Sequence, residues 1–213
     1  MPRFSYYVFF DVDETLLKIK TMDSFLKYYT SINKKNIVFN FKDPNCTREE
    51  LNLAYYKIFT GENIQYLDEI GKDWFLTIDK VENYNQIIIN ELNIHKNNGA
   101  GIILVSGSMH SCLDPLKDKL GASYVICSNQ KVVSNTLTGE LVMPQTVGSG
   151  KAWAIKSLCN IQNIINLDNS YAYGDHISDL DMLSLVGNPV VVGSDEKLLY
   201  IAKQRKWRII DEL

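Results

Sequence analysis

Five short runs of β-branched, aromatic and other apolar residues constrain the fold of this chain more than any other feature of its sequence. They cover residues 4–12, 101–105, 123–127, 170–173 and 189–192. Unbroken runs of this length suit strands that are buried on both faces, as in a parallel sheet. Helix-period segments cover residues 111–120, 151–158, 178–186 and 196–204. The alternation predicts an α/β fold with a Rossmann-like parallel sheet and right-handed crossovers.

A long segment directly after the first strand breaks this alternation. Residues 18–98 contain no run that suits a buried strand, whereas helix-period stretches cover residues 22–29, 48–59, 64–76 and 81–95. Thr47 and Glu50 form a capping-box pattern that opens the second stretch. We therefore predict two units, which are an α/β core from residues 1–17 and 99–213 and a helical insert from residues 18–98.

A β-hairpin is predicted in the later part of the core. Two short β-type segments, residues 131–133 and 140–142, flank the polar stretch 135–139. Gly139 is the expected turn residue, because glycine tolerates the backbone angles that tight turns need.

Composition and processing signals exclude several function classes. The 213 residues include 22 basic and 25 acidic side chains, a net charge of −3, so no positive field favours nucleic acid or an anionic membrane. The first apolar run is too short to span a bilayer. The cysteines form no CxxC pair, which argues against a zinc knuckle or redox dithiol and favours a cytoplasmic location. They are Cys46, Cys112, Cys127 and Cys159.

Acidic residues follow two of the predicted strands. Asp11 and Asp13 end the first run, and Asp175 and Asp179 follow the run at 170–173. Ligands of open α/β sheets bind at the carboxyl ends of the strands, so we expect these side chains to converge there. Converging carboxylates repel one another unless a cation joins them, and hard oxygen ligands suit Mg²⁺. Each acidic pair by itself also fits a solvated turn.

Two further segments carry groups that suit an anion. Ser106 and Gly107 directly follow the second strand, where a hydroxyl and a backbone amide can both donate hydrogen bonds. Lys151 lies in the first turn of a predicted helix, where its charge opposes the helix dipole unless an anion is bound. The segment is not a P-loop, because Gln145 replaces the first glycine and Ala152 the metal-binding hydroxyl residue.

The order of these patterns is more specific than any one of them. A DxDxT motif at Asp11, an apolar strand into Ser106, a helix-opening Lys151 and a GDxxxD motif at Asp175 follow one another. This order resembles the haloacid dehalogenase (HAD) superfamily of aspartyl-nucleophile hydrolases, in its phosphatase branch, over residues 4–183. The insert at 18–98 lies where phosphoserine-phosphatase-like members carry a small helical-bundle cap.

The resemblance implies a chemistry for each motif. Asp11 would be the nucleophile that forms an aspartyl-phosphate, and Asp13 the acid that protonates the leaving oxygen and later activates water. Mg²⁺ would be held by the carboxylates of Asp11 and Asp175 and the carbonyl of Asp13, with Asp179 ordering its water shell. The groups expected to hold the phosphoryl oxygens or support the nucleophile loop are Thr15, Ser106, Gly107 and Lys151.

The substrate position departs from the phosphoserine phosphatases, which carry a glutamate shortly after their first motif. This chain has Lys18 and Lys20 there and no acid. An anionic substrate is therefore favoured over phosphoserine, although the two lysines also fit solvated charges at a hinge. His176, inside the last motif, is a further candidate for contact with substrate.

The function predicted from this resemblance is a Mg²⁺-dependent phosphomonoester hydrolase that acts on a small phosphorylated metabolite. A phosphotransferase or mutase that uses the same aspartyl-phosphate stays open, because the motifs do not distinguish water from another acceptor. A receiver-type signalling module is the third alternative. Receivers are shorter, lack the helical insert and carry their phosphorylated aspartate after a later strand. The sequence predicts neither the natural substrate nor an oligomeric state.

Overall fold

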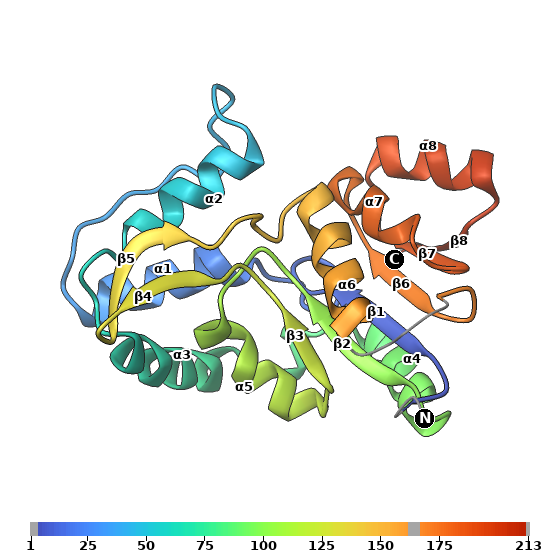
Figure 1. The fold of residues 1–213 in the computed structure, drawn as a ribbon, viewed down its shortest axis with the longest axis horizontal. Helices are drawn as coiled ribbons and strands as arrows, with labels where there is room; N and C mark the ends of the chain where they lie inside the picture. The colour runs from blue at the N-terminus through green and yellow to red at the C-terminus, as the bar shows by residue number, and fades with distance from the viewer. Residues whose placement is uncertain (1–3, 162–166, 212–213) are drawn as a thin grey trace.

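Six parallel strands form the central sheet of the protein (Figure 1), and a computed structural model describes residues 4–161 and 167–211. The strand order is β3-β2-β1-β6-β7-β8. The strands are β1 (Tyr7–Asp11), β2 (Gly101–Val105), β3 (Tyr124–Ile126), β6 (Tyr171–Gly174), β7 (Asn188–Val192) and β8 (Arg208–Ile210). The five apolar runs of the sequence supply β1 to β3, β6 and β7, which confirms the predicted α/β fold. The short edge strand β8 was missed, because its three residues include a charged one.

Helices cover both faces of the sheet, because side chains along β1 alternate between two apolar clusters. Val8 and Phe10 pack into the cluster with α4 and α5, whereas Tyr7 and Phe9 pack into the cluster with α6, α7 and α8. These helices are α4 (Gln86–Asn97), α5 (His110–Leu120), α6 (Ser149–Ile161), α7 (Leu180–Leu183) and α8 (Glu196–Arg205). Burial on both faces explains why the strands read as unbroken apolar runs.

Strand register brings the chemical motifs to one edge. Asp11, the last residue of β1, pairs with Val105 at the end of β2, and Phe10 pairs with Tyr173 near the end of β6. The chain segments that follow these strands therefore leave the sheet side by side. This is the edge at which the sequence predicts that the acidic residues converge.

The insert contains three helices, α1 (Thr21–Ile32), α2 (Arg48–Lys57) and α3 (Ile64–Ile78), and the short 3-10 helix η1 (Val81–Asn83). The predicted capping box forms, since the Glu50 amide donates to Thr47 Oγ1 at 3.1 Å and the Thr47 amide donates to Glu50 Oε2 at 2.8 Å. A buried aromatic cluster joins the helices. It consists of Phe25, Tyr29, Tyr55, Phe59 and Trp74. These five aromatic residues therefore stabilise the interior of the insert.

The position of α4 bears on where the insert ends. Helix α4 lies inside the predicted insert, yet it packs on β2, and its His95 accepts or donates a 3.0 Å hydrogen bond with Tyr6 at the start of β1. The Asn85 amide, just before α4, donates to the Leu16 carbonyl at 2.9 Å. We therefore propose that the chain returns to the core near Asn85 and that α4 belongs to the core.

The predicted hairpin forms, with β4 (Gln130–Val133) and β5 (Thr136–Leu141), and β5 packs on α2 of the insert. Its turn is not at Gly139, so that prediction is wrong. Ser134 and Asn135 make the turn with φ of 49° and 63°, the positive angles that tight hairpins use. Gly139 lies within β5, where a Cβ atom would be 2.0 Å from Thr60 Oγ1. It permits close packing against the insert rather than a turn.

The helices of the described residues are too short or too polar to cross a bilayer.

Candidate active site

A cleft of about 880 Å³, including its open mouth, lies at the carboxyl edge of the sheet between the core and the insert. Asp11 enters it from the end of β1, and Asp175 and Asp179 enter it from the loop after β6 and the 3-10 helix η2 (Ile177–Asp179). One carboxylate oxygen from each of these three residues lies within 4.8 Å of the others. The convergence expected from the strand ends is therefore present.

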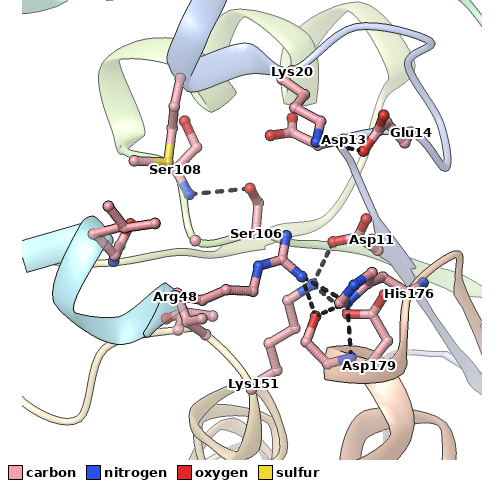
Figure 2. A pocket seen from close by; sticks show the side chains of 18 of the residues that line it. Asp11, Asp13, Glu14, Lys20, Arg48, Ser106, Ser108, Lys151, His176 and Asp179 are labelled. Atoms are coloured by element: carbon pink, nitrogen blue, oxygen red, sulfur yellow. Dashed lines mark hydrogen bonds and ion pairs between the residues drawn. The ribbon is translucent and has the colours of Figure 1, made fainter. Parts of the chain in front are cut away.

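The chain turns sharply after β1 and separates the two carboxylates of the DxD pattern. The Val12 carbonyl accepts hydrogen bonds from the amides of Leu16 and Leu17 at 3.1 and 2.9 Å, and Glu14 adopts a φ of 62°. Asp11 is consequently buried, whereas Asp13 is half-buried and faces the cleft from another direction (Figure 2). Two like side chains thus acquire different surroundings within three residues.

Asp13 is oriented by the start of α1. Its Oδ1 accepts a hydrogen bond from the Thr21 amide at 3.0 Å. Burial raises the pKa of Asp13, and the hydrogen bonds from Thr21 offset only part of that effect. A raised pKa favours the protonated form, which is the form that can donate a proton to a leaving group.

Lys151 lies in the first turn of α6 and is buried among acids. Its Nζ donates to Asp11 Oδ1 and, at 2.7 Å, to Asp179 Oδ1. Burial by itself lowers the pKa of Lys151, but the charges of Asp11 and Asp179 outweigh it and raise that pKa above its usual range. The lysine therefore stays charged. The start of α6 packs closely against the segment before it, since a Cβ atom on Gly150 would lie 1.9 Å from the backbone carbonyl oxygen of Gln145.

Asp175 is held by the loop that follows β1. Thr15 is fully buried and donates its hydroxyl to Asp175 Oδ1 at 3.0 Å. Burial, followed by the charge of Asp179, raises the pKa of Asp175 to about 6. Thr15 lies outside the residues that line the cleft, so it positions an acidic residue rather than presenting its hydroxyl to a ligand.

Burial and the charge of Asp179 raise the pKa of both Asp11 and Asp175, so a cation would stabilise this group of carboxylates. Asp11, Asp175 and Asp179 offer hard oxygen atoms as ligands, and among the described residues the Lys151 ammonium forms ion pairs with two of them. Hard divalent cations prefer such ligands. These residues could therefore hold a metal ion beside Lys151.

The loop after β2 forms another wall of the cleft. Ser106 is buried, and its Oγ accepts a hydrogen bond from the Ser108 amide at 3.1 Å. The Gly107 carbonyl accepts from the Tyr56 hydroxyl of α2 at 2.9 Å, which ties this loop to the insert. Ser106 and Gly107 both line the cleft where the sequence predicts a phosphate site.

The three residues predicted to contact substrate separate into two groups. Lys20 and His176 line the mouth of the cleft, and Lys20 forms a 2.9 Å ion pair with Glu14. Lys18 is exposed and does not line the cleft. Its amide donates to the Asn83 carbonyl at 2.8 Å, where the chain enters the insert. Lys18 therefore fits the alternative reading of a solvated hinge charge.

Helix α2 contributes two polar residues to the cleft, Arg48 and Asn52, that the sequence analysis did not predict. Arg48, the first residue of this helix, extends over the cleft (Figure 2) and donates from Nη1 to Ser178 Oγ at 2.7 Å and to His176 Nδ1 at 2.8 Å. Asn52 is buried one turn later and donates to Gln145 Oε1 at 2.7 Å. The capping box marks where the helix starts, but no pattern relates residue 48 to residues some 130 positions away.

Comparisons with known proteins agree with this geometry. The sequence model of the family described as haloacid dehalogenase-like hydrolase matches residues 8–184. A putative hydrolase from Mycobacterium leprae is 31% identical over 71% of this chain and 50% of its own length. The chain thus spans about half the length of this curated relative.

Two solved structures share the fold. A Bordetella pertussis protein of unknown function has a TM-score of 0.82 at 17% identity, with 97% of this chain and 98% of that chain covered. A phosphoserine phosphatase with a phospho-aspartyl intermediate analogue has a TM-score of 0.66 at 20% identity, with 98% and 93% covered. The two solved structures show the fold, and the family match over residues 8–184 shows that the chain belongs to the haloacid dehalogenase-like hydrolases.

Proposed function

We propose that this protein is a Mg²⁺-dependent phosphomonoester hydrolase that acts on a small phosphorylated metabolite. The observation that carries the proposal is the buried contact of Lys151 with Asp11 and Asp179, with a third carboxylate, Asp175, within 4.8 Å. This arrangement supports a nucleophile, a phosphate-binding cation and a metal site that share one cleft. Family membership leaves the receiver-type alternative without support, because the matched family is a hydrolase family.

The proposed metal ligands are the carboxylates of Asp11 and Asp175 and the backbone carbonyl of Asp13, with Asp179 binding through water. Mg²⁺ suits them because all are hard oxygen donors that leave room for water and phosphate. When bound, the ion would neutralise charge on the phosphoryl oxygens and lower the barrier to attack by an anion. The same ion would relieve the repulsion that raises the pKa of Asp175.

In the first proposed step, a carboxylate oxygen of Asp11 attacks the phosphorus atom and the ester P–O bond breaks. Asp13 donates its proton to the leaving oxygen, so the product alcohol departs neutral. Lys151, Ser106 and the Gly107 amide hold the equatorial oxygens, whose charge a phosphoryl transfer must stabilise. The raised pKa of Asp13 supports this role, because it keeps the proton available.

In the second step, a water molecule attacks the phosphorus of the Asp11 phosphate, and the acyl-phosphate P–O bond breaks. Asp13, now ionised, accepts the proton of that water. Inorganic phosphate leaves and Asp11 regains its carboxylate. One residue thus acts first as an acid and then as a base, and each step balances its proton.

The proposal includes a small phosphate ester as the partner of this chain and the cytoplasm as its location. The cleft is lined by polar and charged side chains that suit a small anionic ester. All four cysteines are free, as in a reducing compartment.

A phosphate-release screen tests the function. Sugar, nucleotide, amino-acid and lipid-headgroup phosphates, together with p-nitrophenyl phosphate, are incubated with Mg²⁺ or with EDTA. We expect release of inorganic phosphate that requires Mg²⁺. Consumption of an ester that yields a phosphorylated acceptor instead of phosphate would identify a phosphotransferase, and no turnover of any ester would contradict the proposed chemistry.

A further inference from the structure

We propose that the mouth of the cleft holds an anion-binding subsite formed by Arg48 and Lys20, which selects phosphomonoesters that carry a second negatively charged group. This inference rests on the proposed hydrolase function and specifies its substrate class. Arg48 comes from α2 of the insert and Lys20 from the segment that leads into α1, and both line the same cleft as Asp11 and Lys151.

The charge of Arg48 is not neutralised in this structure. Its hydrogen-bond acceptors, His176 Nδ1 and Ser178 Oγ, are uncharged groups, because an accepting Nδ1 carries no proton. Within residues 4–161 and 167–211, Arg48 forms no ion pair, and its Nε and Nη2 donors have no hydrogen-bond partner. A guanidinium with free donors is a ready partner for a carboxylate or phosphate, which it can bind through two parallel hydrogen bonds.

The other cations of the cleft differ from Arg48 in this respect. Lys151 contacts Asp11 and Asp179, and Lys20 contacts Glu14 at 2.9 Å with both side chains about half exposed. The Lys20 pair is solvated, so an entering anion can share its ammonium at little cost. Arg48 thus provides the free charge, and Lys20 adds to the positive field of the same cleft, since both charges act on His176.

Arg48 is also held in place before any ligand arrives. The capping box of Thr47 and Glu50 fixes the first turn of α2, and Asn52 joins the next turn to the core through Gln145 at 2.7 Å. The contacts with His176 and Ser178 orient the guanidinium itself toward the cleft (Figure 2). Such preorganisation reduces the entropy lost when a ligand binds.

The acids at the mouth do not favour an ammonium group on the substrate. Glu14 is paired with Lys20, and Asp23 is paired with Lys27 at 2.7 Å. A substrate ammonium would meet the Arg48 charge instead, and like charges repel. The mouth therefore selects an anion over a cation.

The subsite lies close to the phosphoryl site. Arg48 binds Ser178, and the next residue, Asp179, contacts Lys151 at 2.7 Å. The second anion must consequently be only a few bonds from the phosphate. In a phosphate ester of a three-carbon acid, the carboxylate and the phosphate are separated by this small number of bonds. The phosphate of a macromolecule has no such requirement.

Matched probe esters test the subsite with Mg²⁺ present. 3-Phosphoglycerate and glycerol 3-phosphate differ only by a carboxylate in place of a hydroxymethyl group, and phosphoethanolamine carries an ammonium. We expect kcat/KM to be about 10- to 100-fold higher for 3-phosphoglycerate than for glycerol 3-phosphate, the value of one charge-assisted interaction. Phosphoethanolamine should be the poorest of the three. A wild-type enzyme that prefers glycerol 3-phosphate would overturn the proposal without any variant.

Variants then assign the preference to Arg48. We expect Arg48→Gln to reduce the ratio of kcat/KM values for 3-phosphoglycerate and glycerol 3-phosphate at least about tenfold, and Arg48→Lys to reduce it less, since the charge stays but the planar fork is lost. Lys57→Gln removes one charge from the exposed far end of the same helix and should keep the wild-type ratio. An unchanged ratio in Arg48→Gln would refute the subsite. Hydrolysis of p-nitrophenyl phosphate, which has no second anion, reports the proposed function separately.

Discussion

The charged site residues of the core are buried, whereas the charged residues of the insert compared with them are exposed. In the core, Lys151, Asp11 and Asp179 are at most 8% exposed at their side chains and compensate one another away from water. In the insert, the ion pair of Lys35 and Glu62 and the Arg48 guanidinium are partly or largely exposed. Buried charges are expensive to alter, whereas exposed charges change at little cost. This difference fits the proposal that the core supplies the chemistry and the insert selects the substrate.

Removal of the Asp11 carboxylate from the buried charges of the core should have the largest effect. Asp11→Asn should lower kcat at least about a thousandfold, because an amide cannot form the covalent intermediate. The variant should keep a cooperative thermal transition, since the side-chain volume is unchanged and Lys151 retains Asp179. Phosphate release and circular-dichroism melting measure the two.

Asp181→Asn is the matched control, because Asp181 is an exposed acid outside the cleft. It should leave both kcat and the melting temperature close to wild type. A folded Asp11→Asn enzyme with near-wild-type kcat would show that another residue is the nucleophile.

The second prediction distinguishes the role of Asp13 from that of its neighbour Asp11. Asp13→Asn should lower kcat by about a hundredfold or more on an alkyl phosphate, because the leaving alkoxide then receives no proton. The loss should be smaller on p-nitrophenyl phosphate, whose leaving group departs without protonation. Equal losses on both esters would argue against Asp13 as the general acid.

The third effect concerns the contact between insert and core. Asn52→Ala leaves the buried side-chain oxygen of Gln145, Oε1, without its donor at 2.7 Å. The variant should therefore lower the free energy of unfolding by about 1–3 kcal/mol. Urea denaturation measures it. Asn93→Ala, at an exposed helical asparagine of α4, is the control and should change stability far less. Equal losses in the free energy of unfolding of the two variants would show that Asn52 does not stabilise the contact between the insert and the core.

The smallest effect tests the exposed charges of the insert. Lys35 Nζ donates to Glu62 Oε1 and to the Tyr29 hydroxyl, each at 2.6 Å, yet Lys35→Met should cost less than about 1 kcal/mol because the pair is solvated. Lys57→Met, which removes an exposed lysine without an ion pair, is the comparison.

The pH dependence of this small effect has a definite sign. Hydrogen bonds from Lys35 and Tyr29 lower the pKa of Glu62 below its ordinary 4.5. A carboxyl whose pKa is lower in the folded state stabilises the protein above its unfolded pKa, and this contribution disappears as the pH falls through the folded pKa. The difference between wild type and Lys35→Met should therefore shrink below about pH 4.5. A difference that grows on acidification would contradict the pairing.

Particular residues show where sequence reasoning succeeded and where it failed. Asp11 ends a buried strand, and Ser106 and Asp175 directly follow two others, so their convergence could be predicted from the apolar runs and from the way parallel strands end at one edge. Gly139 was misplaced because glycine signals either a turn or a close approach, and only the packing against Thr60 distinguishes the two. Helix α4 reads as part of the insert by its position in the chain, yet its apolar face packs on β2.

The α/β core, the helical insert and the family could be predicted from the sequence, because strands, helices and motifs are local patterns with a fixed order. The folded chain was needed to show that Lys151 contacts Asp11 and Asp179, that Thr15 donates a hydrogen bond to Asp175, and that Arg48 contacts Ser178 in the cleft. Those contacts join residues from 28 to 160 positions apart. Local propensity cannot specify them, since they depend on how the insert packs against the edge of the sheet.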